Sequence, residues 1–505
     1  MNPREQSRKR KSFVSLLLLC AFLIGILWFA FASSSGIRFD NDQMLYDRDV
    51  RISQYRGEGR IVLAVLLEHC FPAQWNPLLY GLLFLLLFAS SGAVLTLLLY
   101  RFTERTWPLS LYGLFFLLFG SSPVWAFQFY FTVQAPAVAL GMLAAAVLAA
   151  ADVQLRTRSR RSPLLRILFE AAALLLCTAL ILIYQSLIIY YVIVALLLLF
   201  CRLLRGAALR WPSLFLWAGR VILSLVLYVW IARTLRGGDS YYLMNQIQWG
   251  REPVETCLAN IAVEFGKLLL LSHSGHFSLY LPGILLTVLL LILKFRKQAF
   301  ARREEVLLVL CAVAFCLMPL AISILEGSRP VPRTQFSLQL VSAFLPLCFA
   351  AEINRARKPI MIIAVLVVLL QGVLVARLTY TDERRSAADL EAANRITGDL
   401  HTLDAEDKPL VFIGTAAFSD ETLLMEKTDV IGLSFFEWSY APESPGSAAG
   451  GAFRLLRAAT GRSYAWPSGD MISEAAALSE AMPSYPSDGY LLETDLFCVI
   501  KLSEP

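Results

Sequence analysis

Residues 78–100, LLYGLLFLLLFASSGAVLTLLLY, form an apolar run without a charged side chain. A helix needs about 20 predominantly apolar residues to cross the hydrocarbon core of a bilayer. Similar runs recur along most of the chain, which has 505 residues, 57% of them hydrophobic and 17% charged. Because soluble domains contain about 25% charged residues, this composition predicts an all-α polytopic membrane protein.

Basic residues are concentrated in short segments between the apolar runs. These segments are residues 101–105, 156–166, 202–210, 294–303 and 355–358. Short loops rich in Lys and Arg remain in the cytoplasm, so all of them are expected on that side. This arrangement predicts about eleven transmembrane helices, with the N-terminus inside and the C-terminus outside. The net charge of +6 therefore reflects orientation in the membrane and does not indicate nucleic-acid binding.

The first apolar run, residues 13–31, follows a basic segment and ends near the small-residue sequence Ala-Phe-Ala. These features are typical of a secretory signal peptide. The run is also nearly long enough to span a membrane, and for that reason we favour an uncleaved signal anchor. Both alternatives place the segment that follows outside the cytoplasm.

The composition changes after residue 378, and this change predicts two domains. Residues 1–378 are expected to form a transmembrane domain with long external loops at 34–77 and 236–277. Residues 379–505 are expected to form a small extracytoplasmic α/β domain. The whole chain is thus interpreted as a multi-pass membrane protein with an outer soluble domain.

Three segments support the α/β prediction for the second domain. Residues 382–403 have the spacing of a helix. Residues 409–415, PLVFIGT, are typical of a buried strand that ends at a glycine turn. Apolar and polar residues alternate along residues 491–502, and this pattern indicates a closing strand or a hairpin.

The first external loop contains residues 37–60, IRFDNDQMLYDRDVRISQYRGEGR, which combine carboxylates with arginines. Asp40 and Asp42 are two residues apart, so an extended backbone points both side chains to one face. Two such carboxylates can share a proton or a divalent metal such as Mg or Mn, and either arrangement prepares one to act as a base. Arginines such as Arg60 offer planar donor sets that suit phosphate oxygens. The alternative is a solvated loop of salt bridges.

Two further external turns carry polar residues that could reach the same site. Tyr184 and Gln185 join two apolar runs with almost no connector, and Arg329 and Arg333 flank a Pro-Val-Pro sequence. The prolines restrict the backbone and would hold both guanidinium groups near the outer membrane surface, where a lipid-linked phosphate lies. The alternatives are interface anchors for the arginines and a plain polar turn for the other pair.

The second external segment is rich in aromatic residues, among them Tyr241 and Trp249. Tyrosine and tryptophan at this density suit a membrane interface, and they also suit stacking on sugar rings. Both interpretations remain open from the sequence.

Polar residues inside the apolar runs have ordinary explanations. Arg220 is expected to snorkel toward the cytoplasm. Glu170 lies four residues after Arg166 and is expected to pair with it on a helix. The nine cysteines are scattered without metal-binding spacing and are interpreted as small buried hydrophobes. The chain has no Walker motif and no G-x-S-x-G, so an ATP-driven pump or a serine hydrolase has no support.

The order of several short motifs resembles the membrane-embedded glucosyltransferases of the O-antigen type-II family. The resembling motifs are F-D-N-D-Q and G-E-G-R-I in the first loop, Y-Q-S-L-I at Tyr184, and the turn from Arg329 to Arg333. In the tail they are D-L-E-A-A-N-R-I, K-P-L-V-F-I-G and M-P-S-Y-P. The first loop departs from the expected pattern, because Asn41 separates the two aspartates and Gln43 follows them where an aromatic residue is expected.

The resemblance implies a C-type glycosyltransferase fold, a location in the bacterial inner membrane and a defined reaction. A glucosyl or similar hexosyl group would pass from a polyprenyl-phosphate sugar to a cell-surface glycan on the outer side of the membrane. A separate lipid-sugar synthase and a flippase would supply the donor. No cofactor is required, although a divalent metal at the aspartate pair is compatible with the scheme.

The resemblance also implies roles for the candidate residues. Asp40 or Asp42 would accept the proton of the attacking hydroxyl, and the departing lipid phosphate would be stabilised by arginines. The phosphate-binding candidates are Arg60, Arg329 and Arg333, and the substrate-binding candidates are Asp47, Tyr184, Gln185, Tyr241 and Trp249.

Two other functions remain as alternatives. The same fold could use another donor sugar or a protein acceptor, since nothing in the sequence distinguishes between sugars. A transporter or flippase of lipid-linked sugars is the non-enzyme alternative. Transporters tend to have ionisable residues at mid-membrane and internal symmetry, and neither is expected from this sequence.

Overall fold

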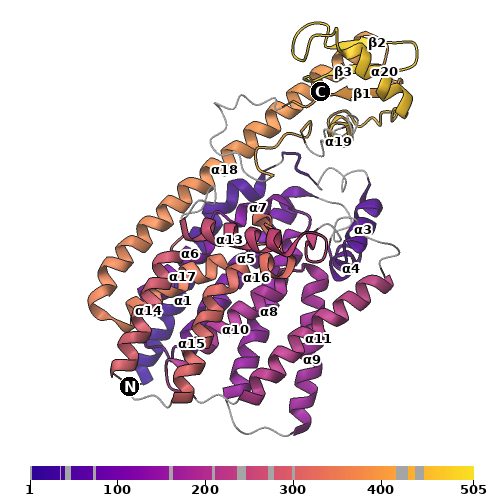
Figure 1. Ribbon diagram of the computed structural model, residues 1–505. Helices are drawn as coiled ribbons and strands as arrows, with labels where there is room; N and C mark the ends of the chain where they lie inside the picture. The colour runs from indigo at the N-terminus through magenta and orange to yellow at the C-terminus, as the bar shows by residue number, and fades with distance from the viewer. Residues whose placement is uncertain are drawn as a thin grey trace. The chain divides into compact units, whose positions relative to one another are not determined.

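The computed structural model describes residues 3–34, 36–39, 47–71, 76–157, 163–207, 211–235, 246–270, 278–297, 302–416, 430–437 and 449–504. It is mostly helical, with 75% helix and a small sheet. The chain forms two compact units (Figure 1). The helical unit contains Met1–Ser33 and Asp49–Val375, and the sheet unit contains Ser34–Arg48 and Ala376–Pro505.

The helical unit is built from apolar helices joined by short turns. In chain order its elements are α1 (Pro3–Ser33), α3 (Arg48–Gly57), α4 (Ile61–His69), α5 (Pro77–Phe102), α6 (Leu109–Gly120), α7 (Trp125–Tyr130), α8 (Ala135–Thr157), α9 (Pro163–Ile183), α10 (Leu187–Leu203), α11 (Trp211–Leu235), α13 (Val254–Leu270), α14 (Tyr280–Lys297), α15 (Arg302–Leu317), η1 (Met318–Leu320), α16 (Ala321–Glu326), η2 (Pro332–Thr334), α17 (Leu338–Glu352) and α18 (Asn354–Thr402), whose last part from Ala376 belongs to the sheet unit.

Within the described residues, seven helices are long and apolar enough to cross a membrane. They are Arg8–Ser33, Pro77–Phe102, Ala135–Arg156, Leu164–Ile183, Pro212–Leu235, Arg302–Glu326 and Asn354–Thr402. Other apolar helices are shorter, and α6 with 12 residues is about 18 Å long against a hydrocarbon core of about 30 Å. The polytopic all-α character is confirmed in this coarser form, and the number of about eleven spans stays a prediction.

Glycines allow the helices of this unit to approach closely. A Cβ atom added to Gly81 in α5 would clash with the carbonyl of Ala32 in α1, and one added to Gly141 in α8 would clash with Leu187 in α10. Small residues at helix crossings increase van der Waals contact, which is what holds helices together in an apolar solvent.

The sheet unit contains a three-stranded sheet in the order β1-β3-β2. The strand β1 (Leu410–Ile413) runs parallel to β3 (Cys498–Lys501), and β2 (Leu491–Glu493) runs antiparallel to β3. The predicted strand at 409–415 is therefore confirmed, and the segment 491–502 is a hairpin. Two helices, α19 (Ala449–Thr460) and α20 (Gly469–Ser479), complete the described part of this unit.

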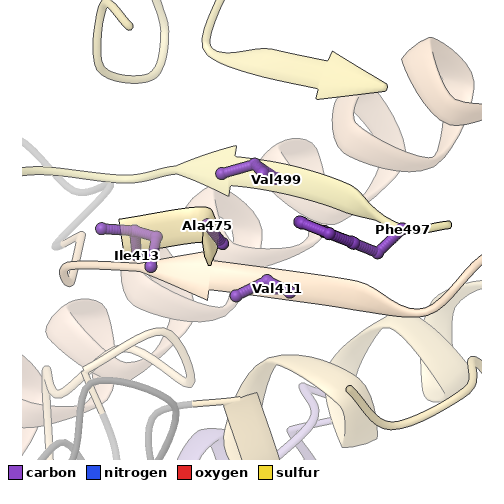
Figure 2. Close-up of a cluster of buried hydrophobic side chains, with 5 residues drawn as sticks. All are labelled: Val411, Ile413, Ala475, Phe497 and Val499. Carbon is purple, nitrogen blue, oxygen red and sulfur yellow. The ribbon is translucent and has the colours of Figure 1, made fainter. Parts of the chain in front are cut away.

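The core of the sheet unit forms where α20 covers one face of β1 and β3. Figure 2 shows the buried side chains that meet there, which are Val411, Ile413, Ala475, Phe497 and Val499. Each is at most 1% exposed. Alternate residues of a strand point to one face, so Val411 and Ile413 reach the helix together.

A buried chain of charges attaches the start of the first loop to the sheet unit. Arg38 is 1% exposed and contacts Asp382 at 2.6 Å, and Asp382 also contacts Arg385 at 2.9 Å. Arg385 in turn donates a hydrogen bond to the carbonyl of Ile37 at 2.9 Å. Residues 34–48, which the sequence assigns to the transmembrane domain, thus cluster with the sheet unit.

The helix α18 is longer than the sequence suggests. Separate elements are expected at 360–378 and 382–403, but α18 is continuous over 49 residues. Residues 373–397 contain neither glycine nor proline, so nothing in this stretch interrupts the helical hydrogen bonds.

Candidate functional site

A cavity of about 130 Å³ in the helical unit brings together residues from distant parts of the sequence. Three of the predicted site residues, Arg60, Tyr184 and Gln185, contribute to its wall. Its other polar lining residues are Ser186, Tyr228, Gln246, Glu326 and Thr334, and its apolar lining residues are Ile181, Ile188, Ile189, Leu225, Ile322 and Leu325.

A sharp turn between α3 and α4 positions Arg60. Gly59 adopts a left-handed backbone with φ of 75°, and the amide of Arg60 bonds to the carbonyl of Tyr55 at 2.8 Å. A side chain at Gly59 would be strained and would lie 2.8 Å from the hydroxyl of Tyr228. The Glu-Gly-Arg sequence therefore ends α3 and turns Arg60 into the interior, where it is only 8% exposed.

The guanidinium group of Arg60 is surrounded by polar and aromatic groups. It donates to Gln134 Oε1 at 2.8 Å and forms an ion pair with Glu58 Oε2 at 3.0 Å. Its Cζ atom lies 5.0 Å from the centre of the Tyr184 ring, within cation–π range. These contacts fix the orientation of a cation at the wall of the cavity.

Glu58 is shared by two arginines. Besides Arg60, it accepts a contact from Arg51 Nη1 at 3.4 Å, and Arg51 also lies over the Tyr55 ring at 4.0 Å. Two guanidinium groups therefore share this one carboxylate. Such an arrangement is suited to a phosphate group, because anions are strongly favoured where cations are partly shielded from water.

The turn between α9 and α10 provides Tyr184 and Gln185. The side-chain amide of Gln185 donates to the carbonyl of Glu58 at 3.1 Å and to the hydroxyl of Tyr228 at 3.0 Å. Both amide protons are used in this way, and Oε1 has no hydrogen-bond partner among the described residues. That oxygen is therefore able to accept a hydrogen bond from a ligand hydroxyl.

Glu326 is a cavity residue that the sequence did not single out, although it begins the turn that contains Arg329 and Arg333. Ser328 donates to its Oε2 atom at 2.9 Å, whereas Oε1 has no hydrogen-bond partner among the described residues. The signal that could have identified it is an acidic residue placed directly before a glycine where an apolar run ends.

The backbone around Glu326 is held by several hydrogen bonds. Gln248 N donates to the carbonyl of Glu326 at 2.7 Å, and Trp249 Nε1 donates to the carbonyl of Ile324 at 2.9 Å. Gly327 closes α16 in the left-handed region with φ of 68°, and a Cβ atom there would lie 2.9 Å from Cys257 Sγ. Trp249 therefore supports the turn, and it is not among the residues that line the cavity.

The two arginines of this turn contact residues that do not line the cavity. Arg329 is exposed and donates through Nε to Asn260 Oδ1 at 3.0 Å. The Cζ atom of Arg333 lies 5.2 Å from the centre of the Phe131 ring. Neither arginine lines the cavity, although Thr334, next to Arg333, does so. Their predicted role as phosphate ligands stays a prediction.

The remaining predicted residues lie elsewhere or outside the described residues. Asp47 belongs to the sheet unit and pairs with Arg457 at 2.8 Å. Asp40, Asp42 and Tyr241 lie outside the described residues, and so does the predicted metal site. Among the residues that the structure does describe, no group of three or more His, Cys, Asp or Glu side chains is arranged to hold a metal ion.

A buried ionic cluster contradicts the two expectations for charges inside the apolar runs. Arg220 is 5% exposed and contacts Asp152 as well as Glu170 Oε2, the latter at 2.9 Å. Arg156 approaches the same two carboxylates at 3.2 Å and 3.0 Å. Arg220 therefore does not snorkel, because two carboxylates compensate its charge within the helix bundle.

The pairing predicted for Glu170 is also wrong, since its partners come from α8 and α11 rather than from its own helix. Two arginines and two carboxylates give this cluster no net charge. Its presence weakens the sequence argument against a transporter, because ionisable groups do occur within the apolar helices.

Comparison with known families gives one result for the chain. The family model described as Glucosyl transferase GtrII matches residues 29–350. Searches of the curated proteins and of the solved structures find no match. The matched region contains all the residues that line the cavity at Arg60.

Proposed function

The chain belongs to the GtrII glucosyltransferase family, and we propose that it transfers a glucosyl or similar hexosyl group from a polyprenyl-phosphate sugar to a cell-surface glycan on the outer side of the membrane. Membership of the family makes the protein a glycosyltransferase, and its long apolar helices make it a membrane protein. The observation that supports the donor class best is the cavity in which the Arg60 guanidinium lies beside hydroxyl-binding side chains.

The donor phosphate would bind at Arg60. Its guanidinium group offers planar donors that suit phosphate oxygens, and its buried position strengthens the attraction to an anion. As the sugar leaves the lipid phosphate, negative charge develops on the phosphate oxygens, and a fixed guanidinium stabilises that charge. Arg329 and Arg333 would contribute to the same phosphate from the neighbouring turn.

The hexose would occupy the polar part of the cavity. Glu326 Oε1 and Gln185 Oε1 can each accept a hydrogen bond from a sugar hydroxyl, and Gln246 and Tyr228 offer further donors and acceptors. Together these carboxylate, carboxamide and phenol groups can form hydrogen bonds with the several hydroxyl groups of a hexose. Tyr184 adds an aromatic wall for the apolar face of the ring.

The chemical step needs a proton acceptor, for which Asp42 or Asp40 is proposed. The acceptor hydroxyl oxygen attacks the anomeric carbon, the bond from that carbon to the phosphate oxygen breaks, and the hydroxyl proton passes to the carboxylate. A divalent metal such as Mg or Mn at Asp40 and Asp42 would neutralise phosphate charge. The donor would come from a separate lipid-sugar synthase and flippase.

The proposal is tested on surface glycans. Cells with the protein, cells without it and cells with Asp42→Asn, at matched expression, are compared for the mass and linkage of their glycans. A hexose that appears only with the intact protein is expected. A protein-dependent hexose that survives the substitution would move the proton acceptor to Asp40. The absence of any added hexose, together with no transfer from a labelled lipid-phosphate hexose by the purified protein, would refute the proposal.

A further inference from the structure

A large groove lies where the N-terminal end of α1 meets the C-terminal end of α5. It has a volume of about 1310 Å³. The N-terminal end of α1 is marked in Figure 1. Its lining residues are Lys9, Arg10, Phe13, Val14, Leu97, Tyr100, Arg101, Glu104, Arg105, Thr106, Trp107, Pro108 and Leu109. None of these residues belongs to the cavity at Arg60, so the groove is a separate feature of the helical unit.

The groove is strongly basic. Four of its lining residues are cations, namely Lys9, Arg10, Arg101 and Arg105. Among the described lining residues Glu104 is the only carboxylate, and Arg202 already contacts it at 3.3 Å. Arg10, Arg101 and Arg105 alone therefore outnumber the one described carboxylate of the groove.

Packed aromatic rings lie behind the surface of the groove. Phe13 from α1 stacks on Tyr100 from α5, with ring centres 4.0 Å apart. Trp107 is 5% exposed and stacks on Tyr112 at 5.6 Å. Cations beside an apolar, aromatic surface form a site for an amphipathic anion, because each part of such a ligand finds a matching surface.

The turn that follows α5 is held in an unusual conformation. Glu104 and Arg105 both adopt left-handed backbone angles, with φ of 55° and 64°. Left-handed residues other than glycine are uncommon and persist where the surroundings enforce them, often at functional sites. Here Arg105 N bonds to the carbonyl of Tyr100 at 3.0 Å, and the Arg105 guanidinium lies 5.7 Å from the Tyr100 ring centre.

We propose that this groove binds the phosphate headgroup of an anionic phospholipid from the leaflet that faces the basic loops. Both α1 and α5 contain candidate membrane spans, so the groove lies where such a helix pair meets the headgroup region. The phosphate would lie among Arg10, Arg101 and Arg105, with the lipid chains along Val14 and Leu97. The volume exceeds the 300–1000 Å³ or so of a small-molecule pocket, which favours a lipid over a free phosphate ion.

The test uses the full-length protein, purified in detergent and stripped of lipid. Phosphatidylglycerol and phosphatidylcholine with identical chains are added separately, and native mass spectrometry counts the bound molecules. The test variant combines Arg101→Gln with Arg105→Gln, and a second variant replaces both residues with Lys. The matched control combines Arg296→Gln with Arg303→Gln, two arginines that do not line the groove. Monodisperse elution on size exclusion confirms that each variant is folded.

The wild type is expected to retain phosphatidylglycerol in preference to phosphatidylcholine. A basic residue near an anionic lipid contributes roughly fivefold in affinity, so the Gln pair is expected to lose about 25-fold. The Lys pair and the control are expected to retain the preference. Equal binding of both lipids by the wild type, or full retention by the folded Gln pair, would overturn the proposal. Displacement of phosphatidylglycerol by an equal concentration of inorganic phosphate would assign the groove to a free phosphate and also overturn it.

Discussion

The guanidinium carbon of Arg60 lies 5.0 Å from the centre of the Tyr184 ring, although the two residues are far apart in the sequence. Arg60 comes from the turn before α4, and Tyr184 comes from the turn between α9 and α10. Their contact joins the basic first loop to the wall of a cavity that also contains Glu326.

Replacement of Arg60 is expected to impair transfer more than it impairs folding. Arg60→Gln should lower kcat/KM for a lipid-phosphate hexose by about 100- to 1000-fold, as is typical when one donor to a developing negative charge is removed. Arg60→Lys should lower kcat/KM by a smaller factor, because lysine retains the positive charge although it lacks the planar donor set. Transfer from a radiolabelled donor to purified glycan measures both. Arg296→Gln serves as the control, and equal activity of Arg60→Gln and wild type would remove Arg60 from the donor site.

Glu326 is expected to contribute to recognition of the sugar. Glu326→Gln keeps the size of the side chain but removes a charged acceptor, so kcat/KM should fall about 10- to 100-fold, since hydrogen bonds to charged groups contribute roughly 1.5–3 kcal/mol. The same variant should discriminate less between the hexose and a deoxy analogue that lacks the contacted hydroxyl. Unchanged discrimination across a series of monodeoxy donors would show that Glu326 does not contact the sugar.

Two neighbouring glycines give a matched pair of substitutions. Gly59→Ala should reduce transfer and destabilise the protein by roughly 1–2 kcal/mol, because a Cβ atom there is strained at φ of 75° and lies 2.8 Å from the Tyr228 hydroxyl. Gly57→Ala should be nearly neutral, since no atom lies within 4 Å of the added group. Thermal unfolding in detergent and transfer activity are compared for both. Equal effects of the two substitutions would contradict the geometry of this turn.

Loss of one partner from the buried ionic cluster is expected to destabilise the protein. Arg220→Gln leaves Asp152 and Glu170 with a single arginine, so the free energy of unfolding should fall by about 3–5 kcal/mol. The combination of Arg220→Gln with Asp152→Asn should recover part of that loss, because it restores the balance of charge. Arg166→Gln, at an exposed position, is the control. A stability of Arg220→Gln equal to that of the control would show that the cluster contributes nothing.

Thiol labelling tests the proposed sidedness of the first loop. Cys70 is the one exposed cysteine among those described, whereas burial raises the pKa of the Cys498 thiol to about 11. A raised thiol pKa keeps the sulfur protonated at neutral pH, so Cys498 should react little while the protein is folded. A membrane-impermeant maleimide should label Cys70 in intact spheroplasts, and Cys70→Ser should abolish the signal. Labelling that requires permeabilised cells would place this loop on the cytoplasmic side.

Much of the helical architecture follows from local sequence. Apolar runs such as residues 78–100 predict membrane helices because lipid offers no hydrogen-bond partners, so a segment that is apolar and long enough to span must pair its own backbone groups. The strand at β1 and the turn at Gly414 are likewise visible in PLVFIGT. The family could also be recognised, since the order of short motifs is a property of the chain itself.

The continuity of α18 was less predictable. Helix boundaries depend on packing as well as on propensity, so two expected elements at 360–378 and 382–403 are one helix. Short apolar helices such as α6 are shorter than the thickness of the hydrocarbon core, so the number of about eleven spans stays a prediction.

The sequence by itself determined the class of protein, the family and three residues of the candidate site, Arg60, Tyr184 and Gln185. Tertiary structure alone decided which charges meet. It paired Arg220 with Asp152 and Glu170, and it brought Glu326 to the cavity. It also joined Arg38 to Asp382 within the sheet unit. A buried charge takes the partner that the packed helices bring within reach, and sequence spacing gives no measure of that distance.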